Sequence, residues 1–244
     1  MTVLAGYFSV HLRELRQRFI AIFVAILVAS CVAYAFIEPL VRLLVQPLRR
    51  AHPATRRLVY TNLPEAFVSY FKVALLAGLI LAFPVIVYQL WMFVAPGLHR
   101  HEKRAALTVV GWGGVLFVSG VLFAYGVVLP QALHFLLSFA GPGLTPQLKL
   151  DAYLTFVARS GLAFGLAFEL PFLMVMAVKT GLLDRNYFAR HRKYSYIGIC
   201  VIAFLLTAGD LVSTVLVAVP LCGLYEVGGL LGRMFGAKQQ TTTE

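Results

Sequence analysis

The chain has 244 residues, of which 60% are hydrophobic and 13% are charged, and its mean hydropathy is +0.84. Soluble domains carry about 25% charged residues, so these proportions exclude an ordinary soluble domain and predict a multi-pass, all-α membrane protein. The net charge of +11 indicates basic loops that contact anionic membrane lipids, and we expect no nucleic-acid partner.

No residue pattern indicates a cofactor. The three cysteines, Cys31, Cys200 and Cys222, lie in apolar runs without ligand spacing, which predicts small buried side chains and no disulfide framework. His99 and His101 have no third ligand nearby, so we predict no metal site and no cofactor.

The first predicted span follows a basic segment, residues 1–18. Nineteen uncharged residues, 19–37, are enough to cross a bilayer core of about 30 Å at about 1.5 Å per residue. The run is too long for a signal-peptide core, so we expect it to be retained. The next stretch, 40–64, contains Pro47 and five arginines and predicts an interfacial loop with short helical pieces.

The second and third spans are bounded by prolines and charges. Pro64-Glu65 is a favourable helix start, and Pro84 is expected to bend the helix that follows. A short charged connection, 95–104, leads to a third span that we expect Pro130 to end.

Three charged residues near the ends of the predicted spans are expected to act on their own segment of the chain. We expect Lys72 to extend to the interface, Asp151 to cap the fourth helix, and Asp210 to mark the turn between the last two helices. Those two helices have only sixteen and fifteen uncharged residues, 194–209 and 211–225, and are predicted to be short.

Together these segments predict a single membrane domain over 1–244, with a disordered cytoplasmic tail at 234–244. The predicted spans are residues 19–38, 66–95, 105–129, 152–178, 194–208 and 211–231. Thirteen Lys and Arg lie on the side of the termini and six on the other side, which predicts that both termini are cytoplasmic.

Glu169 is an ionisable residue inside the fourth span, where a charged side chain costs roughly 2.5–3.5 kcal/mol to insert. Gly161 and Gly165 share its helix stripe, which predicts close packing against another helix, and Pro171 is expected to kink the helix beside it. Two interpretations stay open: a functional site, or a protonated structural Glu hydrogen-bonded to a neighbouring helix.

Four motifs, in order along the chain, resemble the TatC family, the largest core subunit of the twin-arginine protein translocase. The motifs are His11-Leu-x-Glu14-Leu-Arg16-x-Arg18, Phe83-Pro84-x-x-x-Tyr88-Gln89-x-Trp91-x-Phe93-x-x-Pro96-Gly97-Leu98, Glu102-x-Arg104, and Phe164-Gly165-x-x-Phe168-Glu169-x-Pro171. The chain departs from the family where Ala208-Gly209 replaces frequent prolines and Thr214 replaces a frequent Gln, which puts in doubt any partner contact that the amide makes.

The resemblance implies a cup-shaped receptor of six helices in the cytoplasmic (inner) membrane. Such a receptor binds twin-arginine signal peptides at its cytoplasmic face and, with the single-span partners TatA and TatB, exports folded proteins using the proton-motive force. It also implies self-association in a larger complex.

Recognition of paired arginines calls for carboxylates, because guanidinium groups bind them bidentately. By resemblance Glu102 is the recognition residue, with Glu14 and Arg16 beside it. The alternative for Glu102 is a solvated loop charge that only sets topology. The other residues assigned to signal-peptide recognition are Arg104, Phe93 and Pro96.

Glu169 is predicted to contact a polar residue of a partner helix. Pro47, Pro84, Pro171 and Asp210 are assigned structural roles, and packing or kinking is also the alternative for Phe93 and Pro96. A polytopic small-solute transporter or a structural membrane subunit remains the rival function. A membrane hydrolase is not expected, since no Ser or Cys nucleophile pairs with an intramembrane His.

Overall fold

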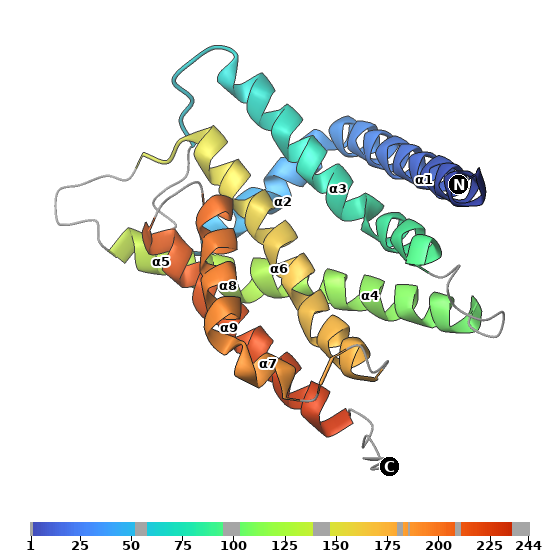
Figure 1. Ribbon diagram of the computed structural model, residues 1–244. Helices are drawn as coiled ribbons and strands as arrows, with labels where there is room; N and C mark the ends of the chain where they lie inside the picture. The colour runs from blue at the N-terminus through green and yellow to red at the C-terminus, as the bar shows by residue number, and fades with distance from the viewer. Residues whose placement is uncertain are drawn as a thin grey trace. The chain divides into compact units, whose positions relative to one another are not determined.

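The computed structural model describes residues 2–51, 58–94, 103–138, 147–179, 183–184, 186–207 and 211–235 (Figure 1). The side chains of 2–12, 51, 93–94, 103–109, 179, 206 and 235 lie outside the described part. Within that part every regular element is a helix, and one isolated bridge pairs Val59 with Lys149. The elements are α1 Thr2–Ala35, α2 Ile37–Ala51, α3 Glu65–Val94, α4 Lys103–Phe123, a π-helical turn η3 Ala124–Val128, α5 Leu129–Ser138, α6 Leu150–Lys179, α7 Tyr187–Arg190, α8 Arg192–Leu206 and α9 Leu211–Phe235.

Five segments in the described part are long and apolar enough to cross a bilayer, which confirms the all-α, multi-pass prediction. They are Arg13–Ala35, Glu65–Met92, Val110–Ser138, Leu150–Val178 and Leu211–Met234. The sixth predicted span corresponds to α8, whose 15 residues extend about 22 Å. The count of six spans, the cup shape and the single-domain boundaries therefore stay predictions.

The chain divides into two compact units, and α4 and α6 contribute residues to both. The first unit comprises Met1–Val115 and Thr145–Ala158. In it α1 packs along α3 (Figure 1), and a Cβ at Gly78 would lie 2.1 Å from Ser30 Oγ. The absence of a side chain at Gly78 therefore allows the two helices to approach closely.

The amphipathic helix α2 also belongs to the first unit. Pro47 and Leu48 are buried, and Arg49 and Arg50 are exposed in its last turn. Tyr153 donates its hydroxyl to the Leu44 carbonyl at 2.8 Å, which joins α2 to the start of α6. The prediction of helix within 40–64 is confirmed by α2, which begins earlier, at Ile37; the interfacial placement stays a prediction.

The second unit comprises Leu116–Leu144 and Arg159–Glu244 and contains an apolar core to which η3, α6, α8 and α9 contribute. Phe164, Ala124 and Ala203 are fully buried in it. A Cβ at Gly120 would lie 2.4 Å from the Phe164 carbonyl oxygen, so α4 and α6 touch through their backbones. In the same unit α8 packs against α9 (Figure 1).

Pro130 does not end the third helix, contrary to the prediction. In an unbroken α-helix its ring would clash with the carbonyl four residues earlier. Instead η3 directly precedes it, and the Leu129 N–H donates to the Ala124 carbonyl five residues back. The wider π turn accommodates the proline, and the chain continues as α5.

The prediction that both final helices are short is wrong for the last one. Helix α8 is short, but α9 has 25 residues, about 37 Å, and runs through Glu226 to Phe235. The charge at Glu226 does not end the helix because its carboxylate is bound by Arg192 and Tyr196.

Candidate functional site

Glu169 lies on α6 with 8% of its surface exposed. Gly161 and Gly165 are also buried, and a Cβ at Gly165 would lie 2.6 Å from the ring of Phe117 on α4. The predicted stripe does face another helix. Close contact between α4 and α6 through this stripe holds the Glu169 backbone in place.

The surroundings of Glu169 are apolar and aromatic. Phe164 and Phe168, five residues and one residue before Glu169 on α6, place their rings 6.1 and 5.4 Å from the ring of Phe123. Two residues beyond the carboxylate, Pro171 cannot donate a backbone hydrogen bond. There α9 approaches closely, since a Cβ at Gly228 would lie 2.9 Å from Pro171 Cα.

The Oε1 atom of Glu169 is buried and has no hydrogen-bond partner among the described residues. A buried polar atom without a partner costs about 1–3 kcal/mol, and more if it is charged. The interpretation of Glu169 as a structural residue bonded to a neighbouring helix is therefore not supported for this atom. A hydrogen-bond donor from another molecule would satisfy it.

The N-terminal residues of the predicted recognition patch lie on α1. Glu14 forms an ion pair with Arg18, one turn later on the same helix, and 34% of the Glu14 side chain remains exposed. Arg16 is exposed. An incoming guanidinium would therefore compete with Arg18 for the Glu14 carboxylate.

The other predicted recognition residues are not tested by the structure. Glu102, Pro96 and Asp210 lie outside the described residues. Phe93 and Arg104 belong to α3 and α4, but their side chains lie outside the described part.

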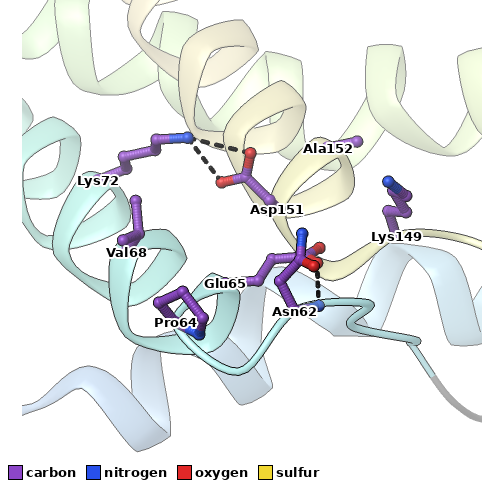
Figure 2. Close-up of a pocket in the computed structure, with 8 residues that line it drawn as sticks. All are labelled: Asn62, Pro64, Glu65, Val68, Lys72, Lys149, Asp151 and Ala152. Atoms are coloured by element: carbon purple, nitrogen blue, oxygen red, sulfur yellow. Dashed lines mark hydrogen bonds and ion pairs between the residues drawn. The ribbon is translucent and has the colours of Figure 1, made fainter.

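A polar contact that the sequence analysis missed joins α3 to α6 in the first unit (Figure 2). Lys72 Nζ donates to both Asp151 carboxylate oxygens, at 2.9 and 3.0 Å. The Ser69 hydroxyl lies 3.1 Å from Asp151 Oδ1 and 2.6 Å from the Glu65 carbonyl oxygen, and its proton is shared between these two acceptors. Asp151 lies in the first turn of α6 but binds side chains of another helix, so its predicted role as a local cap is wrong. The sequence signal that could have predicted this contact was the pair of opposite charges near the predicted outer ends of two spans.

A second missed cluster joins α7, α8 and α9. Glu226 accepts from Arg192 Nη2 at 2.7 Å and from the Tyr196 hydroxyl. The residue before Glu226, Tyr225, donates to the Phe188 carbonyl at 2.8 Å and accepts from Ser195 Oγ at 3.0 Å.

At the other end of α8, the Thr207 and Thr214 hydroxyls lie 2.7 Å apart. Thr214 therefore has a polar contact where the family often has Gln. Within the described part, no three His, Cys, Asp or Glu side chains lie close enough to hold a metal ion.

The chain is similar to known proteins over most of its length. The family model described as Sec-independent protein translocase protein (TatC) matches residues 10–220. The chain is 39% identical to the Sec-independent protein translocase protein TatC of Desulforapulum autotrophicum, over 97% of this chain and 88% of that protein. For the protein of the same name from Aquifex aeolicus the identity is 38%, over 94% and 96%.

A solved structure is similar as well. The crystal structure of a twin arginine translocase receptor, TatC, superposes with a TM-score of 0.85 at 38% sequence identity, covering 93% of this chain and 100% of that chain. The sequence and the fold thus agree over nearly the whole chain, and the protein belongs to the TatC family.

Proposed function

We propose that this chain is the core receptor subunit of a twin-arginine translocation system. It resides in the cytoplasmic membrane with both termini in the cytoplasm and binds twin-arginine signal peptides at that face. With TatA- and TatB-type single-span partners it moves folded proteins across the membrane using the proton-motive force. The observation that carries the proposal is family membership over residues 10–220, together with the similarity to a translocase receptor structure. A subunit of this family is a transport component and not an enzyme.

In this proposal Glu102 receives the paired arginines, with Glu14, Arg16 and Arg104 beside it and Phe93 and Pro96 shaping the patch. The chemistry of guanidinium groups supports the assignment, since two arginines need carboxylates in a fork geometry that lysines do not reproduce. The Glu14–Arg18 pair supports a secondary role for Glu14 in signal-peptide recognition, because the Glu14 carboxylate already binds the Arg18 guanidinium.

The direct test is binding of a twin-arginine peptide and its twin-lysine version by purified protein. We expect weaker binding of the lysine peptide, and reduced binding of the arginine peptide by Glu102→Gln. Glu38→Gln is the matched control, because Glu38 is an exposed carboxylate on α2 that pairs with Arg42 of the same helix. Equal affinity for both peptides would favour the transporter or structural-subunit alternative.

We also propose that Glu169 docks a polar residue of a partner helix within the membrane. Its buried Oε1, which has no partner among the described residues, supports this role. A donor on an otherwise lipid-soluble helix would gain a hydrogen bond there that lipid cannot supply.

Site-specific crosslinking from position 169 tests the docking role. We expect capture of a single-span partner under transport conditions. Co-purification of that partner should survive Glu169→Gln, which keeps a hydrogen-bonding group, and be lost in Glu169→Leu. Failure to capture a partner under any transport condition would show that the role is wrong.

A further inference from the structure

Helices α7 and α8 pack against the C-terminal half of α9 in the second unit (Figure 1), and a small pocket lies between them. Two guanidinium groups line it, from Arg192 at the start of α8 and Arg233 in the last turn of α9, together with the carboxylate of Glu226. The hydrogen bond from Tyr225 to the Phe188 carbonyl joins α9 to α7 at this place. The fold therefore brings two cations from distant parts of the chain to one site.

Both oxygens of the Glu226 carboxylate are already engaged. Oε2 accepts from Arg192 Nη2 at 2.7 Å, and Oε1 accepts from the Tyr196 hydroxyl. The bond to Glu226 uses one of the five N–H donors of Arg192, and 47% of the Arg192 side chain is exposed. Arg233 is exposed, and no ion pair among the described residues includes it. The pocket thus has guanidinium donors available for an anion, while Arg192 offsets the negative charge of Glu226.

The surface around the pocket is basic as well. Residues 186–193 contain Arg190, Arg192 and Lys193 and no acidic residue, and these three cations are exposed. Together with Arg233 they form a cluster of four cations, which we name the terminal basic patch. Clusters of this size at the end of a membrane span, and basic pockets between spans, attract the phosphates of anionic lipids.

The position of the terminal basic patch favours a lipid over a soluble acidic ligand. Arg233 lies one residue before the end of Leu211–Met234, a segment long and apolar enough to cross a bilayer. Tyr194, which follows the cations of α8, is 76% exposed, and tyrosines are enriched at the membrane–water interface. Leu230 lines the pocket and is 54% exposed, and Val227, one turn earlier on α9, is also exposed. An apolar surface for an acyl chain therefore begins at the pocket itself.

We propose that the terminal basic patch binds the headgroup of a phospholipid that carries a net negative charge. The phosphate accepts hydrogen bonds from Arg192 and Arg233, Arg190 and Lys193 add positive potential around it, and an acyl chain lies along the exposed apolar side chains of α9. A zwitterionic headgroup carries an ammonium that these cations repel, so the site prefers phosphatidylglycerol to phosphatidylcholine. The inference does not depend on the proposed receptor function.

Native mass spectrometry of the delipidated full-length protein tests the preference. Phosphatidylglycerol and phosphatidylcholine with the same acyl chains are added in turn, and the retention of the first bound lipid is compared. We expect roughly tenfold stronger retention of phosphatidylglycerol, which equals about 1.4 kcal/mol. Equal retention of the two lipids by the unmodified protein would overturn the proposal. If a glutamate-rich peptide binds the protein and phosphatidylglycerol does not, the patch is a docking surface for protein and the lipid proposal is wrong.

Single substitutions locate the site. Arg233→Gln should weaken retention of phosphatidylglycerol about fivefold, the effect of one cation near an anionic headgroup, and leave phosphatidylcholine unchanged. Arg42→Gln is the matched control, because it also removes one exposed guanidinium, from α2 in the first unit, and it should leave retention of both lipids intact.

Equal losses in Arg233→Gln and Arg42→Gln would show that total charge, and not this patch, determines retention. Unchanged retention of phosphatidylglycerol in Arg233→Gln would likewise overturn the proposal. If Arg233→Gln does not fold, Lys193→Gln decides, since Lys193 is exposed and belongs to the same patch. Retention of phosphatidylglycerol should then fall in Lys193→Gln, and an unchanged value would show that the lipid binds elsewhere.

Discussion

Lys72→Met is expected to lower the free energy of unfolding by about 1–2 kcal/mol. The Lys72 ammonium lies 2.9 and 3.0 Å from the two oxygens of Asp151, a bidentate geometry. Unit charges about 4 Å apart attract each other by about 4 kcal/mol at an effective dielectric constant of 20. With 44% of the Lys72 and 34% of the Asp151 side chain exposed, solvent screening reduces this attraction, and ordering the lysine chain costs up to about 2 kcal/mol.

The measurement is a double-mutant cycle with Lys72→Met and Asp151→Asn, read by thermal unfolding in detergent. In a chain of this size about 1 kcal/mol moves the Tm by about 2–4 °C. We expect the double mutant to lose less than the sum of the single losses, because the second substitution removes a charge that has already lost its partner. Strict additivity of the two losses would refute the assignment of this pair as a stabilising link between α3 and α6.

The matched control is the pair Glu38–Arg42 on α2. Its atoms lie 3.3 Å apart, and its side chains are 78% and 77% exposed. Exposed pairs of this kind contribute little, so Glu38→Gln and Arg42→Met should leave the Tm nearly unchanged.

Two further substitutions test packing and polar contacts in the second unit. Gly120→Ala should lower the free energy of unfolding by about 2 kcal/mol or more, since its Cβ would lie 2.4 Å from a backbone oxygen of α6. Gly114→Ala is the control and should be neutral or slightly stabilising, because its Cβ would have no non-local neighbour within 4 Å in the described part. Equal Tm values for the two variants would contradict the close helix contact. Glu226→Ala should lower the free energy of unfolding by about 1–2 kcal/mol, because Arg192 and Tyr196 lose their acceptor, and Glu226→Gln should lower it by less. If chemical denaturation showed a larger loss for Glu226→Gln than for Glu226→Ala, the hydrogen bonds would be unimportant.

Local patterns in the sequence predicted the helices well because apolar runs, prolines and small residues act within one segment. The spacing of Gly161, Gly165 and Glu169 puts them on one stripe in any α-helix, so the helix-facing side of α6 could be derived without knowing its neighbour. The motifs likewise identified the family, since each is a contiguous stretch of chain.

Contacts between distant segments were not accessible in the same way. Lys72 and Asp151 are 79 positions apart, and only the packing of α3 against α6 shows that they pair. Pro130 and Glu226 are local helix-ending signals, but each is compensated, by a π turn in one case and by Arg192 and Tyr196 in the other. A sequence rule for one residue fails where a neighbour removes the physical reason for the rule.

The two acidic side chains of α6 differ in their hydrogen-bond partners, and this contrast bears on the role of Glu169. Asp151 is satisfied within the chain by Lys72 and Ser69, whereas Glu169 is more deeply buried and its Oε1 has no partner among the described residues. A buried carboxyl oxygen without a partner costs stability, so Glu169→Leu should leave the isolated protein unchanged or stabilise it by about 1–3 kcal/mol. If the proposed docking role is correct, the same variant should fail to retain its partner helix. A marked loss of stability in purified Glu169→Leu, measured by thermal unfolding, would mean instead that the carboxyl group serves the fold of the subunit itself.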